Sequence, residues 1–190
     1  MSGPIPVKLA CRRFAQDKVN PMPLSMYQSA VPVSLRALTN LRAVLVKGHA
    51  HAVAHGYDPG VLLQTRLTAD MLPLVAQVRI ATDMAKNGVA RLAGVDPLPF
   101  DDNEVTFEEL FDRLDRALAY IEGFSAGQID GSEMRAITLK MRSGELHFEG
   151  QAYLLHFVIP NLFFHTTTAY AILRQSGVDI GKLDFIGRPE

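Results

Sequence analysis

Three of the six histidines of this 190-residue chain lie close together, in the segment HAHAVAHG at residues 49–56. His51 and His55 are four residues apart, so on a helix they would share one face and could chelate a metal ion. The segment ends at Gly56, however, and histidines in the last turn of a helix are also favoured by the helix dipole and by the free carbonyl groups there. We therefore expect His49, His51 and His55 to have a capping role and to form no native metal site.

The overall charge is close to zero, with 19 Lys and Arg against 20 Asp and Glu. The chain therefore lacks the excess positive charge that attracts nucleic acid or an anionic membrane, and we expect neither as a partner. Cys11 is the single cysteine, so an internal disulfide and a multi-cysteine metal site are both excluded. This usage fits a reducing compartment, and we expect a cytoplasmic protein.

Residues 1–23 differ in composition from the rest of the chain. They contain four prolines and more basic than acidic residues, and they lack the continuous apolar stretch of a signal peptide. We expect a disordered or mis-assigned N-terminal extension over 1–23, with Met22 or Met26 as the working start. Residues 24–190 are long enough for one domain with one core.

From Leu24 on, apolar residues recur at steps of three and four, which predicts helices. We expect long helices over 26–55 and 70–93, and a third after the capping box Thr106-Phe-Glu-Glu109. A short turn or helix follows Asp58-Pro59. The period changes to two between 136 and 148, around Arg142-Ser143-Gly144, which predicts a β-hairpin. A last helix over 151–175 would end at Gly177.

The last helix carries no charged residue from Gly150 to Leu173, which is long enough to span a bilayer. Its centre contains Pro160, Asn161 and His165, and these polar groups would cost more in lipid than in a protein core that offers partners. We therefore expect a central helix that is buried on nearly every side. The fold class that follows is all-α, a four-helix bundle with a small hairpin before the last helix.

Bundles build their sites from inward-facing polar side chains on neighbouring helices. Asn161 and His165 are four residues apart on the last helix, on the face that also carries Thr168. Gln77 is a polar residue on the small, apolar face of the second helix. The candidate ligand-binding residues are therefore Gln77, Asn161, His165 and Thr168, and His165 is the candidate catalytic residue.

Three segments resemble a family of uncharacterised bacterial proteins that forms a branch of the DinB/YfiT-like four-helix-bundle superfamily. These segments are PNLFFHTTTAYAILRQSGVDIGKLDFIG, SMYQSAVPVSLRAL and DMLPLVAQVRIATDMAKNGVARLAG, and the resemblance covers Ser25 to Gly187. It implies the superfamily's bundle fold. In metal-binding members, one histidine of the second helix and an HxxxH pair of the last helix hold a divalent cation. Matching their LRQLG-like ending to Leu173–Gly177 places these positions on Gln77, Asn161 and His165.

Only His165 matches that ligand pattern. One imidazole and two amides would make a poor site for zinc or nickel, and His165 alone is a weak metal candidate. Three readings of the trio stay open: a buried hydrogen-bond network that fixes helix register, a pocket for a small polar ligand, or a weak metal site completed by water or a carboxylate. Asp83 and Lys86 belong to the same motif, and we expect them to form a surface or interface ion pair.

The sequence thus predicts an uncharacterised DinB-like protein with a degenerate metal site, which is non-catalytic or binds a small ligand and forms a homodimer. The alternative is a metal-independent or weakly metal-dependent transferase or hydrolase, acting on a small cytoplasmic metabolite such as a thiol. No Gly-x-Gly pattern occurs where a strand would lead into a helix, so we expect no nucleotide cofactor and no other cofactor.

Overall fold

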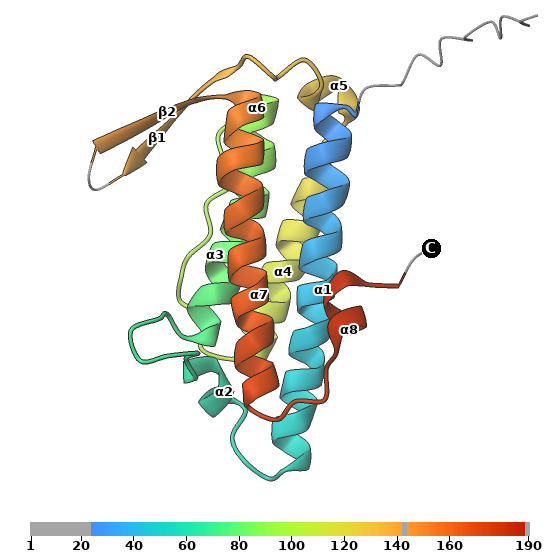
Figure 1. Cartoon of the computed structure of the whole chain (residues 1–190), viewed down its shortest axis with the longest axis vertical. Helices are drawn as coiled ribbons and strands as arrows, with labels where there is room; N and C mark the ends of the chain where they lie inside the picture. The colour runs from blue at the N-terminus through green and yellow to red at the C-terminus, as the bar shows by residue number, and fades with distance from the viewer. Residues whose placement is uncertain (1–23, 142–143, 189–190) are drawn as a thin grey trace, which may run out of the picture.

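The computed structural model describes residues 24–141 and 144–188. Its long helices lie side by side along one axis and form a four-helix bundle, which confirms the predicted fold class (Figure 1). They are α1 (Met26–Ala54), α3 (Leu74–Ala93), α4 (Phe107–Glu122) and α7 (Ile159–Gln175). α7 continues directly from α6 (Gly150–Tyr153) and the π-helical turn η1 (Leu154–Val158), so these three make one helical segment.

The short elements lie at the ends and the flank of the bundle. They are α2 (Gly60–Gln64), α5 (Ala126–Ile129), α8 (Lys182–Ile186) and the strands β1 (Ala136–Met141) and β2 (Gly144–Glu149). The strands pair antiparallel, with Ile137 opposite Phe148, and the hairpin projects from the end of the bundle where α6 begins (Figure 1). The hairpin is confirmed, while its Arg142-Ser143 turn and the extension 1–23 lie outside the described residues.

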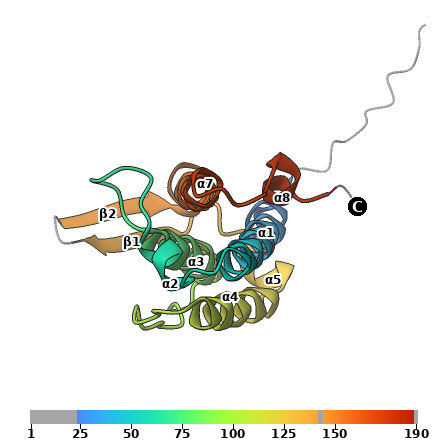
Figure 2. The ribbon, with the colours of Figure 1, turned by 90° about the horizontal axis from the view of Figure 1, so that it is seen from below.

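The direction of the helices explains the long connection between α3 and α4. α3 and α4 run in the same direction, opposite to α1 and α7, so residues 94–106 must return along the length of the bundle (Figure 1). Seen end on, α1 and α3 each pack against both α4 and α7 (Figure 2). The core between them consists mainly of leucine, valine and alanine side chains.

The helix ends follow local sequence signals. Ser25 begins α1 and Thr106 begins α4 with capping boxes, in which the side chain accepts a hydrogen bond from the third helical amide. Gly94 ends α3 with a φ of 75°, a left-handed conformation that favours glycine. α1 continues through Pro32, so this proline does not mark the start of the helix.

The predicted start of the second helix at residue 70 is wrong, because α3 begins at Leu74. Pro73 has an extended ψ of 166° and serves as the N-cap. The ring of a proline disfavours helical geometry in the preceding residue, which keeps Leu72 out of the helix. Residues 70–73 therefore lie outside the helix: the Met71 amide closes a turn by donating to the Thr68 carbonyl at 3.0 Å, and the Leu74 amide donates to the Thr65 carbonyl at 2.9 Å.

The prediction that the last helix is buried on nearly every side is also wrong. Phe164 is 56% exposed and Leu155 is 45% exposed. The helix is interrupted by η1 directly before Pro160, where a π-turn accommodates a residue that cannot donate an amide hydrogen bond. Within residues 24–141 and 144–188, no helix is long and apolar enough to cross a membrane.

α8 was not expected from the sequence and covers part of the outer face of α1. The Arg36 Nε donates to the Ile186 carbonyl at 2.9 Å, and the Asn40 Nδ2 donates to the Phe185 carbonyl at 3.0 Å. Lys47 pairs with Asp184 at 2.7 Å. The polar residues of this face therefore fasten the C-terminal segment to the bundle.

Candidate functional site

Two of the four candidate residues meet at the interface between α3 and α7. The His165 Nδ1 lies 2.7 Å from the Gln77 Oε1, and the Gln77 side chain is almost fully buried. The Gln77 Nε2 donates to the Leu72 carbonyl at 3.0 Å. Because that bond directs the amide nitrogen away from His165, the Gln77 oxygen faces the ring and accepts a hydrogen bond from the Nδ1–H group. The neutral imidazole then carries its lone pair on Nε2.

Pro73 supplies the geometry that orients Gln77. Because Pro73 delays the start of α3, the Leu72 carbonyl lies outside the helix and is free to accept the side-chain amide of Gln77. The same proline therefore sets the start of the helix and the orientation of the amide. His165 in turn is held by α7, whose closest neighbour in the bundle is α3.

The surroundings of His165 favour its neutral form. The imidazole is half-buried, and the Phe164 ring lies edge-on to it at a centroid distance of 5.1 Å. Burial lowers the pKa of His165 below its ordinary value of 6.5. At neutral pH the group is therefore an uncharged base that donates through Nδ1 and accepts through Nε2.

Asn161 and Thr168 do not join this pair. The Asn161 Nδ2 donates to the Phe157 carbonyl at 2.7 Å, and the Thr168 Oγ1 donates to the Phe164 carbonyl at 2.8 Å. Both side chains thus bond to the backbone of their own helix one turn earlier. The structure therefore joins Gln77 and His165 by a hydrogen bond, while Asn161 and Thr168 bond within their own helical segment.

The clustered histidines at the end of α1 make other contacts. The His55 Nδ1 lies 2.8 Å from the His51 carbonyl oxygen, which is the expected capping contact in the last turn. His49 lies against the Phe107 ring, with its Nε2 at 3.5 Å from the Glu108 carboxylate. In the part of the chain that the structure describes, no three His, Cys, Asp or Glu side chains are grouped so that they could hold a metal ion.

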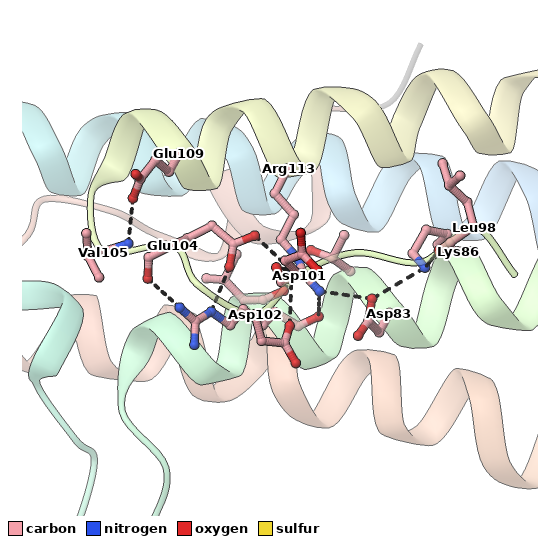
Figure 3. A network of polar contacts seen from close by, with 12 residues as sticks. Asp83, Lys86, Leu98, Asp101, Asp102, Glu104, Val105, Glu109 and Arg113 are labelled. Atoms are coloured by element: carbon pink, nitrogen blue, oxygen red, sulfur yellow. Dashed lines mark hydrogen bonds and ion pairs between the residues drawn. The ribbon is translucent and has the colours of Figure 1, made fainter. Parts of the chain in front are cut away.

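Asp83 and Lys86 form the predicted ion pair, at 3.6 Å, but the pair does not lie at the surface. The Lys86 side chain is only 2% exposed, and Asp83 bonds more closely to Arg113 of α4, at 2.9 Å, than to Lys86, at 3.6 Å. Lys86 also donates to the Leu98 carbonyl and to the Asn87 Oδ1. The pair belongs to a buried network between α3, α4 and the crossover 94–106 (Figure 3).

Arg113 is the centre of this network and is 1% exposed. It bonds to Asp83, to the Glu104 carboxylate at 2.8 Å and to the Asp101 carbonyl at 3.0 Å (Figure 3). Arg79 of α3 holds the other oxygen of Glu104 at 2.8 Å. The network thus fastens the acidic crossover to two helices.

The shifted pKa values in this network follow from its burial and its charges. Burial raises the pKa of Asp83 and lowers the pKa of Lys86, and the attraction between the two groups and that of Arg113 for Asp83 oppose these shifts only in part. For Glu104, burial acts to raise the pKa, but the hydrogen bonds and charge of Arg113 and Arg79 outweigh it and lower the pKa. One feature of the sequence could have predicted this network: the acidic residues of the crossover need cationic partners on the helices that the crossover passes.

A comparison with known families decides where the chain belongs. The family described as Domain of unknown function (DUF1993) matches residues 26–186. The chain belongs to the DUF1993 family. Its structure is similar to the crystal structure of a DinB family member protein from Shewanella denitrificans, with 39% sequence identity and a TM-score of 0.79. The alignment covers 86% of this chain and 92% of that chain. None of the curated proteins matches the DUF1993 chain.

These two matches confirm the resemblance to an uncharacterised family within the DinB-like superfamily. The matched residues include all four long helices and the Gln77–His165 pair of the DUF1993 chain. The interrupted last helix and the delayed start of α3 therefore lie within the part of the chain that matches the family.

Proposed function

We propose that this DUF1993 protein is a non-catalytic DinB-like bundle that binds a small polar ligand at His165 and has lost the metal site of other superfamily members. The hydrogen bond between Gln77 and His165 carries this proposal. It fixes the imidazole tautomer and leaves Nε2 as an oriented acceptor in a half-buried position.

The donor set supports the loss of the metal site. Gln77, Asn161 and His165 offer one imidazole and two amides, and amide oxygens are weak ligands for zinc or nickel. Both amide nitrogens are already bonded to backbone carbonyls, those of Leu72 and Phe157. Residues of this kind do not fit a divalent transition metal.

The same atoms indicate what a ligand must offer. The His165 Nε2 is an acceptor, and Asn161, one helical turn earlier, keeps its Oδ1 as an acceptor because its Nδ2 donates to Phe157. A ligand with N–H or O–H donors suits this arrangement better than an anion. Small amides and hydroxylated metabolites are the ligand class that we propose.

The metal half of the proposal is tested by elemental analysis of protein purified without a histidine tag or a metal column. We expect the wild-type protein to contain no stoichiometric zinc, nickel or iron, so that a His165→Ala variant has the same metal content. A His51→Gln/His55→Gln variant is the matched control, because these clustered side chains can collect metal during purification. Stoichiometric metal that is lost with His165→Ala and kept in the control would refute this half.

The ligand half is tested by NMR of the imidazole nitrogens. We expect His165 to be protonated at Nδ1 and unprotonated at Nε2, and Gln77→Leu to abolish this tautomer preference. Nicotinamide, a small amide, should shift the His165 signals in the wild type and not in His165→Ala. Absence of that shift across nicotinamide and glycerol, a hydroxylated probe, would contradict the ligand class.

A transferase or hydrolase acting on a small thiol remains the second candidate, since a neutral half-buried imidazole is also suited to act as a general base. Thiol transfer from glutathione to an electrophilic model substrate that is lost in His165→Ala would favour it. The homodimer also remains a prediction, and light scattering should give twice the monomer mass.

A further inference from the structure

A hollow of about 450 Å³ lies at the end of α3 that is distant from Gln77. It is an open depression, bordered by the last turn of α3, the start of the crossover and β1. The polar and charged side chains that line it are Arg91, Asp96, Arg135, Thr138 and Lys140. Neither the Gln77–His165 pair nor the Arg113 network contributes to it, so it is separate from both.

Two half-buried guanidinium groups in this hollow are bonded to neutral partners. The Arg91 Nη1 donates to the Tyr153 hydroxyl at 3.0 Å, and the Arg135 Nη1 donates to the Leu92 carbonyl at 2.6 Å. Burial raises the pKa of Tyr153, so its hydroxyl stays uncharged at neutral pH. Among residues 24–141 and 144–188, no carboxylate lies within ion-pair distance of Arg91 or Arg135.

At the other end of the crossover, buried arginines are paired with a carboxylate. Arg79 and Arg113, which are also buried or half-buried, each hold the Glu104 carboxylate at 2.8 Å. A buried charge is costly unless an opposite charge compensates it. Arg91 and Arg135 therefore lack the compensation that the fold provides for the comparable arginines nearby.

The charged side chains around the hollow are mostly positive. Asp96 is the single acidic residue in the lining. Lys140 lies on strand β1, in register with Glu145 of β2. Three cationic side chains, those of Arg91, Arg135 and Lys140, line the hollow against the one carboxylate of Asp96, so the lining carries an excess of positive charge.

We propose that this hollow binds the phosphate or carboxylate group of a small anionic molecule between Arg91 and Arg135. The planar fork of a guanidinium group matches the paired oxygens of both anions. A volume of about 450 Å³ lies within the range of small-molecule sites. Thr138 supplies a hydroxyl on the same wall, where its Oγ1 lies 3.0 Å from the His147 Nδ1.

Gly94 is required for the position of Arg135. A Cβ atom at residue 94 would lie 2.5 Å from the Arg135 Nη1, so any side chain there would displace the guanidinium group. Gly94 also has a φ of 75°, which side-chain-bearing residues rarely adopt. The end of α3 and the position of the Arg135 guanidinium group therefore both depend on Gly94.

The test is titration of the full chain with inorganic phosphate and, separately, with acetate, at constant ionic strength and followed by NMR. We expect saturable shifts at Gly94, Val95 and Thr138 for at least one anion, and the preferred anion identifies the ligand group. Arg91→Gln and Arg135→Gln should each weaken binding by about tenfold or more, as expected for a lost charged hydrogen bond. Lys182→Gln, which removes an exposed charge on α8, should leave the affinity unchanged.

Arg91→Lys and Arg135→Lys are the controls for a folding defect in the glutamine variants. They keep the positive charge but remove the planar guanidinium group. We expect these variants to bind at least about threefold more weakly than the wild type. The proposal is overturned if neither anion gives saturable shifts, if the Lys variants bind as the wild type does, or if Lys182→Gln weakens binding as much as the arginine variants.

Discussion

Replacing Arg113 with methionine should strongly destabilise the protein, because it would leave buried carboxylates without their partner. Arg113 is 1% exposed and bonds to Glu104, which is 8% exposed, and to Asp83, which is 28% exposed. Removing one partner of a buried ion pair typically costs ~3–5 kcal/mol. For a domain of this size, that loss lowers the melting temperature by roughly 6–20 °C.

The cost should depend on pH with a definite sign. In the wild type, the pKa of Glu104 is held below its ordinary value of 4.5, so this carboxylate contributes stability above 4.5 that is lost as the pH falls through its folded-state pKa. In Arg113→Met, burial remains while the main partner is gone, so the pKa of Glu104 rises. The free-energy difference between the two proteins should therefore be largest near neutral pH and shrink toward about pH 4.

Urea unfolding at several pH values measures this difference. Arg116→Met is the matched control, because Arg116 lies on the same helix, is exposed, and only stacks on Phe100 at 4.3 Å. It should cost at most about 1 kcal/mol. Adding Glu104→Gln to Arg113→Met should recover part of the stability at neutral pH. A cost of Arg113→Met below about 1 kcal/mol, or one that is the same at every pH, would refute the reasoning.

Three further predictions use the same unfolding assay. Gly88→Ala should cost about 1–3 kcal/mol, because its Cβ would lie 2.6 Å from the stiff Val158 side chain, whereas Gly127→Ala, with nothing within 4 Å, should not destabilise. Equal effects of the two would contradict close packing of α3 on η1. His165→Gln should remove a pH dependence: burial lowers the pKa of His165, so its contribution is complete above 6.5 and is lost as the pH falls through the folded-state pKa. If the free energies of unfolding of the wild type and the variant change in parallel from pH 8 to 5, this prediction is refuted. Thr106→Ala should cost about 1 kcal/mol, since it removes the side-chain cap of α4, and a neutral effect would show that the cap contributes nothing.

Most helix ends could be predicted because local chemistry sets them. The Thr106 capping box, the glycines at 94 and 177 and the alternation around the hairpin each act within a few residues of the chain, and each appears in the structure where it was expected. α8 carried no comparable signal. It is held by Arg36, Asn40 and Lys47 of α1, which are distant in sequence.

The candidate site was predicted only in part. The face of the last helix and the inward position of Gln77 could be read from helical periodicity, and the Gln77–His165 contact joins them across 88 positions in sequence. That Asn161 and Thr168 would instead bond to carbonyls of their own helix could not be read in this way, because both arrangements have the same spacing.

The sequence by itself determined the helical periods and their caps, because each of these is a property of neighbouring residues or of residue type. Only the tertiary structure decided which polar groups found partners. Asp83 and Lys86 are three residues apart on one helix, which is equally compatible with a surface pair and a buried one. Their burial depends on the path of the crossover over α3 and α4, and on Arg113 reaching it from another helix (Figure 3).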